Sequence, residues 1–181
     1  MGLPAPRQWV DGEEPDNIPS ADDLNVEWRD SFQFLLGYQR PMIYVSSSSG
    51  QAITSTPVAI TWNTEHLIRG GMGHSTVTNS QNITVPYTGW YAGYMMAGFG
   101  TFSTLTTKAT GRLLNGSTIV ALAQSPAVVI GGTEFVISFT TYATANDIYT
   151  MTMAVSSGTT STAATAQVNK PRMAMWFAGD G

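Results

Sequence analysis

The hydrophobic pattern of the chain changes near residue 42. In the segment before it, apolar side chains recur every three or four positions, which is the spacing of one face of an α-helix. The residues of this stripe are Leu24, Trp28, Phe32 and Leu35. Beyond residue 42 the chain consists of short runs rich in Val, Ile, Thr and aromatic residues, separated by Gly, Pro, Asn and Ser. The sequence therefore predicts one helix followed by many short strands.

The expected helix has recognisable start and stop signals. Ser20 is followed by Ala-Asp-Asp, so a serine N-cap precedes acids at the positive end of the helix dipole. Gly37 and Pro41 end the helix. The segment 1–19 contains four prolines and is too polar to fold alone, so it is expected to form an extended arm. Residues 1–41 are accordingly interpreted as an N-terminal attachment arm and helix.

The runs that follow predict an all-β architecture for residues 42–181. Their density, and the turn residues between them, are typical of a sandwich or barrel of short strands. The Ser/Thr/Ala-rich segment 156–166 is expected to be a loop or a surface strand. The predicted strands are MIYVS (42–46), PVAITW (57–62), EHLI (65–68), STVT (75–78), NITV (82–85), WYAGYMMAGF (90–99), KATGRLL (108–114), STIVALA (117–123), AVVI (127–130), EFVISFTTYA (134–143), IYTMTMAV (148–155), QV (167–168) and RMAMWFA (172–178).

The run 90–99 is apolar on both of its faces. One face carries Tyr91, Gly93, Met95, Ala97 and Phe99, and the other carries Trp90, Ala92, Tyr94, Met96 and Gly98. The partner sheet of a two-layer sandwich covers only one face, and the other would promote aggregation if it stayed in water. We expect Trp90, Tyr94 and Met96 to lie in an interface between subunits. The alternative is that the N-terminal helix or a long loop folds over them.

Charge is distributed unevenly along the chain, and this distribution argues against a nucleic-acid partner. Residues 1–40 hold eight acids and three bases, whereas the other 141 of the 181 residues hold four acids and five bases. The bases form no stripe that would neutralise phosphates, so a nucleic-acid partner is not expected. The run 83–100 is interrupted by Pro86 and several glycines, so no membrane helix is expected either.

Candidate catalytic chemistry is sparse. The chain has no cysteine, no nucleophile elbow and no phosphate-binding loop, so we expect neither an enzyme nor a bound cofactor. His66 and His74 lie around the glycine-rich run RGGMGH. We interpret them as surface or hydrogen-bonded histidines rather than as metal ligands.

The aromatic residues admit two interpretations. On strands such residues are most often core or interface, which is the interpretation we favour, but a cluster of them can also form a platform for sugar rings. The residues concerned are Trp62, Trp90, Tyr91, Tyr94, Trp176 and Phe177.

Four segments resemble the globular-head jelly roll of complement and tumour-necrosis-factor-like proteins. They are ITVPYTGWYAGY (83–94), RLLNGSTI (112–119), AVVIGGTEFVISF (127–139) and RMAMWFAG (172–179). The resemblance implies a jelly-roll sandwich that assembles as a homotrimer through apolar strand faces about a threefold axis. Two positions depart from the family pattern: Gly132-Thr133 replaces the usual Gly-Asp turn, and Gly93 replaces an aromatic residue.

The N-terminal segment resembles the leader of many virion proteins of tailed bacteriophages. It reads RQWVDGEEPDNIPSADDLNVEWRDSFQFLLGYQRP (7–41), with a Trp-Val-x-Gly-Glu segment ahead of a helix whose core contains Leu24-Asn25 and Arg29-Asp30. The resemblance implies a protein of the virion surface, assembled in the host cytoplasm, that contacts the major capsid protein or other virion proteins. The residues expected to attach it to the particle are Leu24, Trp28, Phe32 and Leu35.

These features predict a non-enzymatic structural protein of a tailed-phage virion, a capsid decoration or head-fibre protein with a trimeric jelly roll. The alternative is a minor tail protein or receptor-binding tip that attaches to a host-surface glycan. A secreted ligand of the necrosis-factor kind is disfavoured, because the acidic, proline-rich N-terminus lacks the basic and apolar regions of a secretory signal.

Overall fold

The computed structural model describes residues 40–99, 108–125, 134–157, 159–162 and 170–180. By its contacts the chain divides into two units, Met1–Arg40 and Pro41–Gly181. The predicted arm and helix, with the proposed attachment residues Leu24, Trp28, Phe32 and Leu35, lie outside the described residues. The predicted strands 127–130 and 167–168 lie outside them as well.

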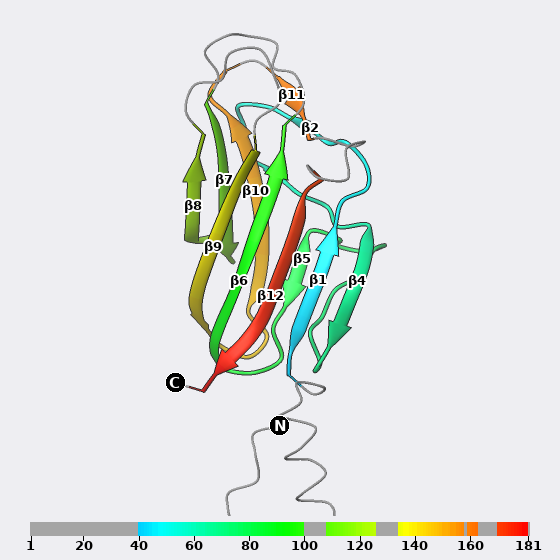
Figure 1. The fold of residues 1–181 in the computed structure, drawn as a ribbon, viewed down its shortest axis with the longest axis vertical. Coiled ribbons are helices and arrows are strands. Elements are labelled where there is room, and N and C mark those ends of the chain that lie inside the picture. The colour runs from blue at the N-terminus through cyan, green and yellow to red at the C-terminus, as the bar shows by residue number, and fades with distance from the viewer. Residues whose placement is uncertain (1–39, 100–107, 126–133, 158, 163–169, 181) are drawn as a thin grey trace, which may run out of the picture. The chain divides into compact units, whose positions relative to one another are not determined.

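The second unit consists of antiparallel sheets stacked face to face (Figure 1). The first sheet has the order β4 (Thr64–Arg69), β1 (Met42–Ser46), β12 (Arg172–Gly179), β6 (Gly89–Gly98) and β9 (Glu134–Ala143). The second has the order β3 (Val58–Ala59), β10 (Ile148–Val155), β7 (Ala109–Asn115) and β8 (Thr118–Gln124), with β5 (Asn82–Thr84) also paired to β10. A small sheet pairs β2 (Ala52–Ile53) with β11 (Thr160–Ser161).

The order of the strands is that of a jelly roll. The first and last strands, β1 and β12, lie side by side within the first sheet. Between them the chain alternates between sheets: β6 belongs to the first, the β7–β8 hairpin to the second, β9 to the first and β10 to the second. Two antiparallel sheets without a helix in the described residues confirm the predicted all-β sandwich.

The hydrophobic core fills the space between the two sheets. Alternate side chains of β6 and β12 point inward, among them Tyr91, Met95, Met173 and Met175, all fully buried. The opposite sheet contributes the row Tyr149, Met151, Met153 and Val155 from β10, which includes two methionines. Methionine fills irregular space well because its chain is unbranched and flexible, which suits a core assembled from so many short strands.

Gly93 is required at the centre of this packing. A Cβ atom at this position would collide with the carbonyl oxygen of Ala174 and would lie 2.6 Å from the ring of Phe139. The Phe139 ring, on the strand paired with β6, thus occupies the space above Gly93. This explains why the aromatic residue that the family resemblance led us to expect at position 93 is absent.

The predicted strand 75–78 is wrong. The chain bends there, and the hydroxyl of Ser75 accepts hydrogen bonds from the backbone N–H groups of Val77 and Thr78, each at 3.2 Å. Val77 is 87% exposed, so its β-branched side chain stabilises no sheet. A serine that satisfies local backbone donors favours a turn over a ladder of strand hydrogen bonds.

The run 90–99 is a β-strand rather than a helix, since β6 spans Gly89–Gly98. In the described part of the chain, no helix is long and apolar enough to cross a membrane.

A core residue stabilises the bend that precedes β6. The Tyr91 hydroxyl donates a hydrogen bond to the Tyr87 carbonyl at 3.1 Å and accepts one from the Tyr87 N–H at 3.4 Å.

Candidate functional site

The outward side of the first sheet is rich in aromatic and apolar side chains. We call this surface the aromatic face. Trp90 is 43% exposed, Tyr142 is 50% exposed and Val136 is 59% exposed, while Tyr94 and Met96 are half-buried. Its members are Met42 and Tyr44 of β1, Trp90, Ala92, Tyr94 and Met96 of β6, Val136 and Tyr142 of β9, and Ala174 and Trp176 of β12.

Large and small side chains alternate across the strands of the aromatic face. Trp176 lies opposite Ala92, and Ala174 lies between Tyr44 and Tyr94. At the end of β6, Trp90 packs edge-on against Tyr142, with ring centroids 5.5 Å apart. The result is a broad surface in which the small residues leave room between the rings, a relief that favours interdigitation with a complementary surface.

The structure places the three residues predicted for a subunit interface on this surface. Trp90, Tyr94 and Met96 all lie on the outward side of β6, at alternating positions, while Tyr91 and Met95 point into the core. The six aromatic residues considered from the sequence divide equally. Trp62, Tyr91 and Phe177 are buried in the core, whereas Trp90, Tyr94 and Trp176 belong to the aromatic face.

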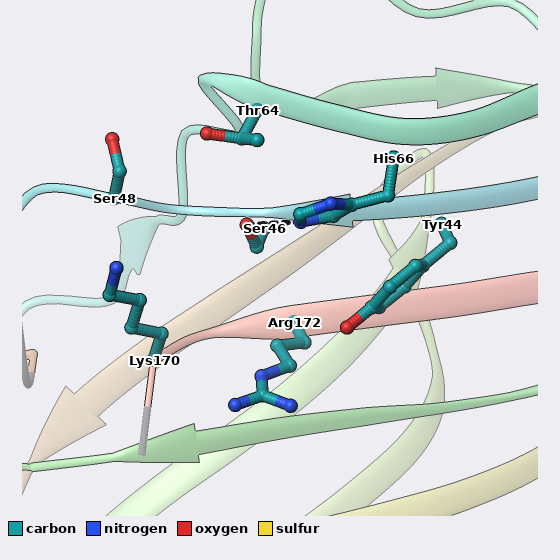
Figure 2. Close-up of a pocket in the computed structure, with 7 residues that line it drawn as sticks. All are labelled: Tyr44, Ser46, Ser48, Thr64, His66, Lys170 and Arg172. Carbon is teal, nitrogen blue, oxygen red and sulfur yellow. Dashed lines mark hydrogen bonds between the residues drawn. The ribbon is translucent and has the colours of Figure 1, made fainter. Parts of the chain in front are cut away.

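A polar pocket of about 250 Å³ lies at one end of the same sheet, where β1, β4 and the start of β12 meet (Figure 2). We call it the cationic pocket. Its lining residues are Tyr44, Ser46, Ser48, Thr64, His66, Lys170 and Arg172. No carboxylate is among them, and neither Lys170 nor Arg172 has an ion pair or side-chain hydrogen bond with any residue that the structure describes.

Hydrogen bonds fix the far wall of the cationic pocket. His66 stacks on Tyr44, with ring centroids 4.7 Å apart, and its Nε2 lies 2.9 Å from the Ser46 hydroxyl. The hydroxyls of Ser48 and Thr64 both donate to the side-chain oxygen of Asn63, at 2.9 and 3.3 Å. Because these hydroxyls use their protons on Asn63, their oxygens remain as acceptors toward the pocket.

His74 is engaged elsewhere. Its side chain is fully buried, its Nδ1 lies 2.7 Å from the Glu65 carboxylate, and its Nε2 lies 3.1 Å from the Ser80 carbonyl oxygen. His74 therefore ties the segment 70–80 to β4, and the two histidines have separate partners.

The described residues contain no group of three or more His, Cys, Asp or Glu side chains placed to hold a metal ion. Burial raises the pKa of Tyr91 to about 12, although the Tyr87 N–H that donates to its phenol oxygen opposes the rise. Burial also raises the pKa of Tyr149. Both phenols belong to the core and neither lines the cationic pocket.

Sequence reasoning missed the cationic pocket. Its two cations, Lys170 and Arg172, are separated by one residue in the sequence, and Arg172 is the first residue of β12. This signal was present in the sequence. The remaining lining residues come from positions more than 100 residues earlier, and only the pairing of β1 with both β4 and β12 brings them to Arg172.

Comparison with solved structures returns crystal structures of murine APRIL at pH 8.0, 8.5 and 5.0. They match with TM-scores of 0.56, 0.54 and 0.52 and identities of 13%, 13% and 12%, each over 76% of this chain and 98% of the APRIL chain. The described sandwich has a tumour-necrosis-factor-like jelly-roll fold. At these identities the likeness concerns the fold alone. No protein-family model matches the chain, and no curated protein matches it.

Proposed function

We propose that this protein is a non-enzymatic structural protein of a tailed-phage virion surface, a homotrimer whose jelly roll assembles through the aromatic face. The aromatic face supports the assembly, and the resemblance of residues 7–41 to the leader of tailed-phage virion proteins supports the virion assignment. Antiparallel sheets that face water on one side normally alternate apolar and polar residues, and β6 does not. A stable interface needs central aromatic anchors surrounded by less critical contacts, and Trp90, Tyr94 and Trp176 supply such anchors.

The energetic argument for assembly rests on side chains that are only partly buried in one chain. Fully burying a large apolar side chain stabilises by roughly 1.5–3 kcal/mol, and Trp90 and Tyr142 each keep about half of their surface exposed. Closing a partner surface over several such residues gives a favourable term that can exceed the entropic cost of association. The threefold symmetry is what the jelly-roll resemblance implies.

Attachment to a particle is assigned to the N-terminal segment. Residues 1–19 are acidic and proline-rich, and fully extended they would span roughly 60 Å, enough to cross a neighbouring subunit. The apolar stripe Leu24, Trp28, Phe32 and Leu35 would provide the main contact. Three copies on one trimer would bind together with a gain in avidity.

The attachment step is tested with full-length variants. Replacing Trp28 and Phe32 with alanine should leave a soluble trimer that no longer co-purifies with phage particles, whereas Ile119→Ala, at an exposed position of β8, should be incorporated normally. Electron microscopy of particles carrying a labelled copy would place the protein on head or tail. Absence of the unaltered protein from purified particles would contradict the virion assignment.

A receptor-binding tip is the second candidate, and one observation favours it. The cationic pocket offers two cations, several hydroxyls and an aromatic ring within about 250 Å³. Structural contacts between virion proteins do not require such a pocket, whereas recognition of a small polar ligand does. A protein that decorates a particle and one that binds a host-surface glycan can share the same trimeric jelly roll.

A further inference from the structure

We propose that the cationic pocket binds an acidic sugar, with the carboxylate of the sugar on Arg172 and Lys170 and the sugar hydroxyls on the opposite wall. This inference deepens the recognition candidate above. It does not depend on the trimer, because all the lining residues belong to one chain.

The charge of the pocket favours an anion. Lys170 and Arg172 lie on the same wall and have no acidic partner among the described residues (Figure 2). Glu65, next in sequence to His66, is already engaged with His74 at 2.7 Å. The guanidinium of arginine presents a planar fork that matches a carboxylate, and hydrogen bonds to a charged group are about twice as strong as neutral ones.

The opposite wall requires more than a bare anion. Ser48 and Thr64 direct their hydroxyl protons to Asn63 and so present oxygen acceptors, which repel an anion but accept hydrogen bonds from ligand hydroxyls. The volume points the same way: about 250 Å³ is roughly eight times the space of one water molecule in the liquid. A compact ring with one carboxylate and several hydroxyls satisfies both walls.

The position of the pocket adjoins the aromatic face. Arg172 pairs with Met96 on one side and with Ser46 on the other, so one row of the sheet contains both an interface residue and the pocket.

The carboxylate of Glu134 is the competing occupant of the cationic pocket. Glu134 pairs with Gly98, two residues beyond Met96 on β6, so it lies toward the same end of the sheet but on the edge strand opposite β4. A second copy of the chain would have to bring this carboxylate to the pocket.

The test is titration of the full-length protein with sodium glucuronate, with glucose and sodium sulfate as probes for the hydroxyls alone and the anion alone. Calorimetry or ligand-observed NMR at low ionic strength should show glucuronate binding at least about tenfold more tightly than either comparator. Arg172→Gln and Lys170→Gln should each weaken glucuronate binding by about tenfold. Lys108→Gln removes the same charge from an exposed position outside the pocket and should change nothing.

Three results would overturn the proposal. Absence of glucuronate binding would remove the site, and equal binding of sulfate and glucuronate would show that only an anion is held. The third result combines two measurements. If Arg172→Gln left the glucuronate affinity unchanged, and if Arg172→Gln and Glu134→Gln each dissociated the protein in sedimentation, the pocket would be a contact between subunits. Sedimentation of the unaltered protein tests the trimer separately, so failure of one inference leaves the other standing.

Discussion

The two outward faces of the sandwich differ in composition although both belong to antiparallel sheets. The aromatic face of the first sheet presents Trp90, Tyr94 and Trp176, whereas the second sheet presents threonines, an arginine and aliphatic side chains. The outward residues of the second sheet include Thr110, Arg112, Leu114, Ile119, Leu122, Gln124, Ile148, Thr150 and Thr152, of which Ile119, Leu122 and Ile148 are 48%, 48% and 42% exposed. The second face thus mixes polar with aliphatic side chains, while the first carries the large aromatic residues that are enriched in interface cores.

The two sides of the single strand β6 also differ, in whether the fold of one chain buries them. Inward residues of β6 are fully buried and are explained by the jelly-roll core alone. Its outward residues contribute nothing to that core, yet they are as apolar as the inward ones. One chain therefore accounts for half of the apolar character of β6, and assembly is proposed to account for the rest.

Charge substitution on the two faces should give the largest difference. Tyr94→Glu would place an unpaired carboxylate at the centre of the proposed interface, which costs about 3–5 kcal/mol when a charge is buried without a partner. On dilution, we expect the Tyr94→Glu trimer to dissociate already at concentrations roughly 100-fold or more higher than those at which the unaltered trimer dissociates.

Leu122→Glu is the matched control, since Leu122 is 48% exposed on the outward side of β8. Analytical ultracentrifugation should find this variant assembled as before, and both variants should melt cooperatively. Equal dissociation of the two variants would remove the distinction between the faces.

Gly93→Ala should be the most damaging small substitution within the sheet. The added methyl group meets the Ala174 carbonyl oxygen and the Phe139 ring, so β6 and β12 must separate or Phe139 must leave its place. Overpacking of this kind costs about 3 kcal/mol, measured as the free energy of unfolding in denaturant.

Gly116→Ala serves as the comparison, because Gly116 has φ of +57° and no atom lies within 4 Å of the place that an added methyl group would take. Its cost should be that of a left-handed residue alone, about 1 kcal/mol. If both variants lost the same stability, close packing at Gly93 would not be what constrains β6.

High pH should destabilise the fold through the buried phenols of Tyr91 and Tyr149. The unfolded chain releases the Tyr91 proton near pH 10, while the folded chain holds it to about pH 12. Between these values the unfolded state has fewer bound protons, so the free energy of unfolding falls as the pH rises, by a total of order 2 kcal/mol.

Chemical denaturation from pH 9 to 12 measures this slope. Tyr91→Phe should reduce it, and the remaining slope should reflect Tyr149, whose pKa burial also raises. A slope unaffected by Tyr91→Phe would mean that this phenol is not desolvated.

Val77→Ser should have the smallest effect. The side chain is 87% exposed in the bend after His74, so its removal should change stability by less than about 0.5 kcal/mol. A thermal melt is sufficient to check this. A larger loss would show that Val77 contacts part of the assembly.

The sequence predicted the strands whose apolar residues alternate over long runs, and it failed where local hydrogen bonding decides the conformation. β1, β9 and β10 have the predicted bounds, because each is long or strongly β-forming and is flanked by turn residues. The segment 75–78 has the same β-branched composition, but the Ser75 hydroxyl captures its backbone donors. Composition alone cannot separate these cases.

The candidate sites differ in the same way. The aromatic face could be predicted because Trp90, Tyr94 and Met96 lie on one strand, where alternation fixes the side on which they point. The cationic pocket could not, because Tyr44, His66 and Arg172 meet only through the pairing of three strands. A bulge between Tyr44 and Val45 shifts the β1–β4 register and sets which residue of β4 reaches the pocket, and nothing in the sequence indicates it.

The central claim is that the aromatic face is a subunit interface, and the molar mass of the full-length protein in solution tests it most directly. Sedimentation equilibrium at micromolar concentration should give about three times the chain mass of 19.4 kDa. On dilution, the unaltered protein should remain a trimer at concentrations at which Tyr94→Glu has dissociated. A single species of 19.4 kDa over the same concentrations would contradict the account. The outward side chains Trp90, Tyr94 and Met96 would then need another cover within the chain.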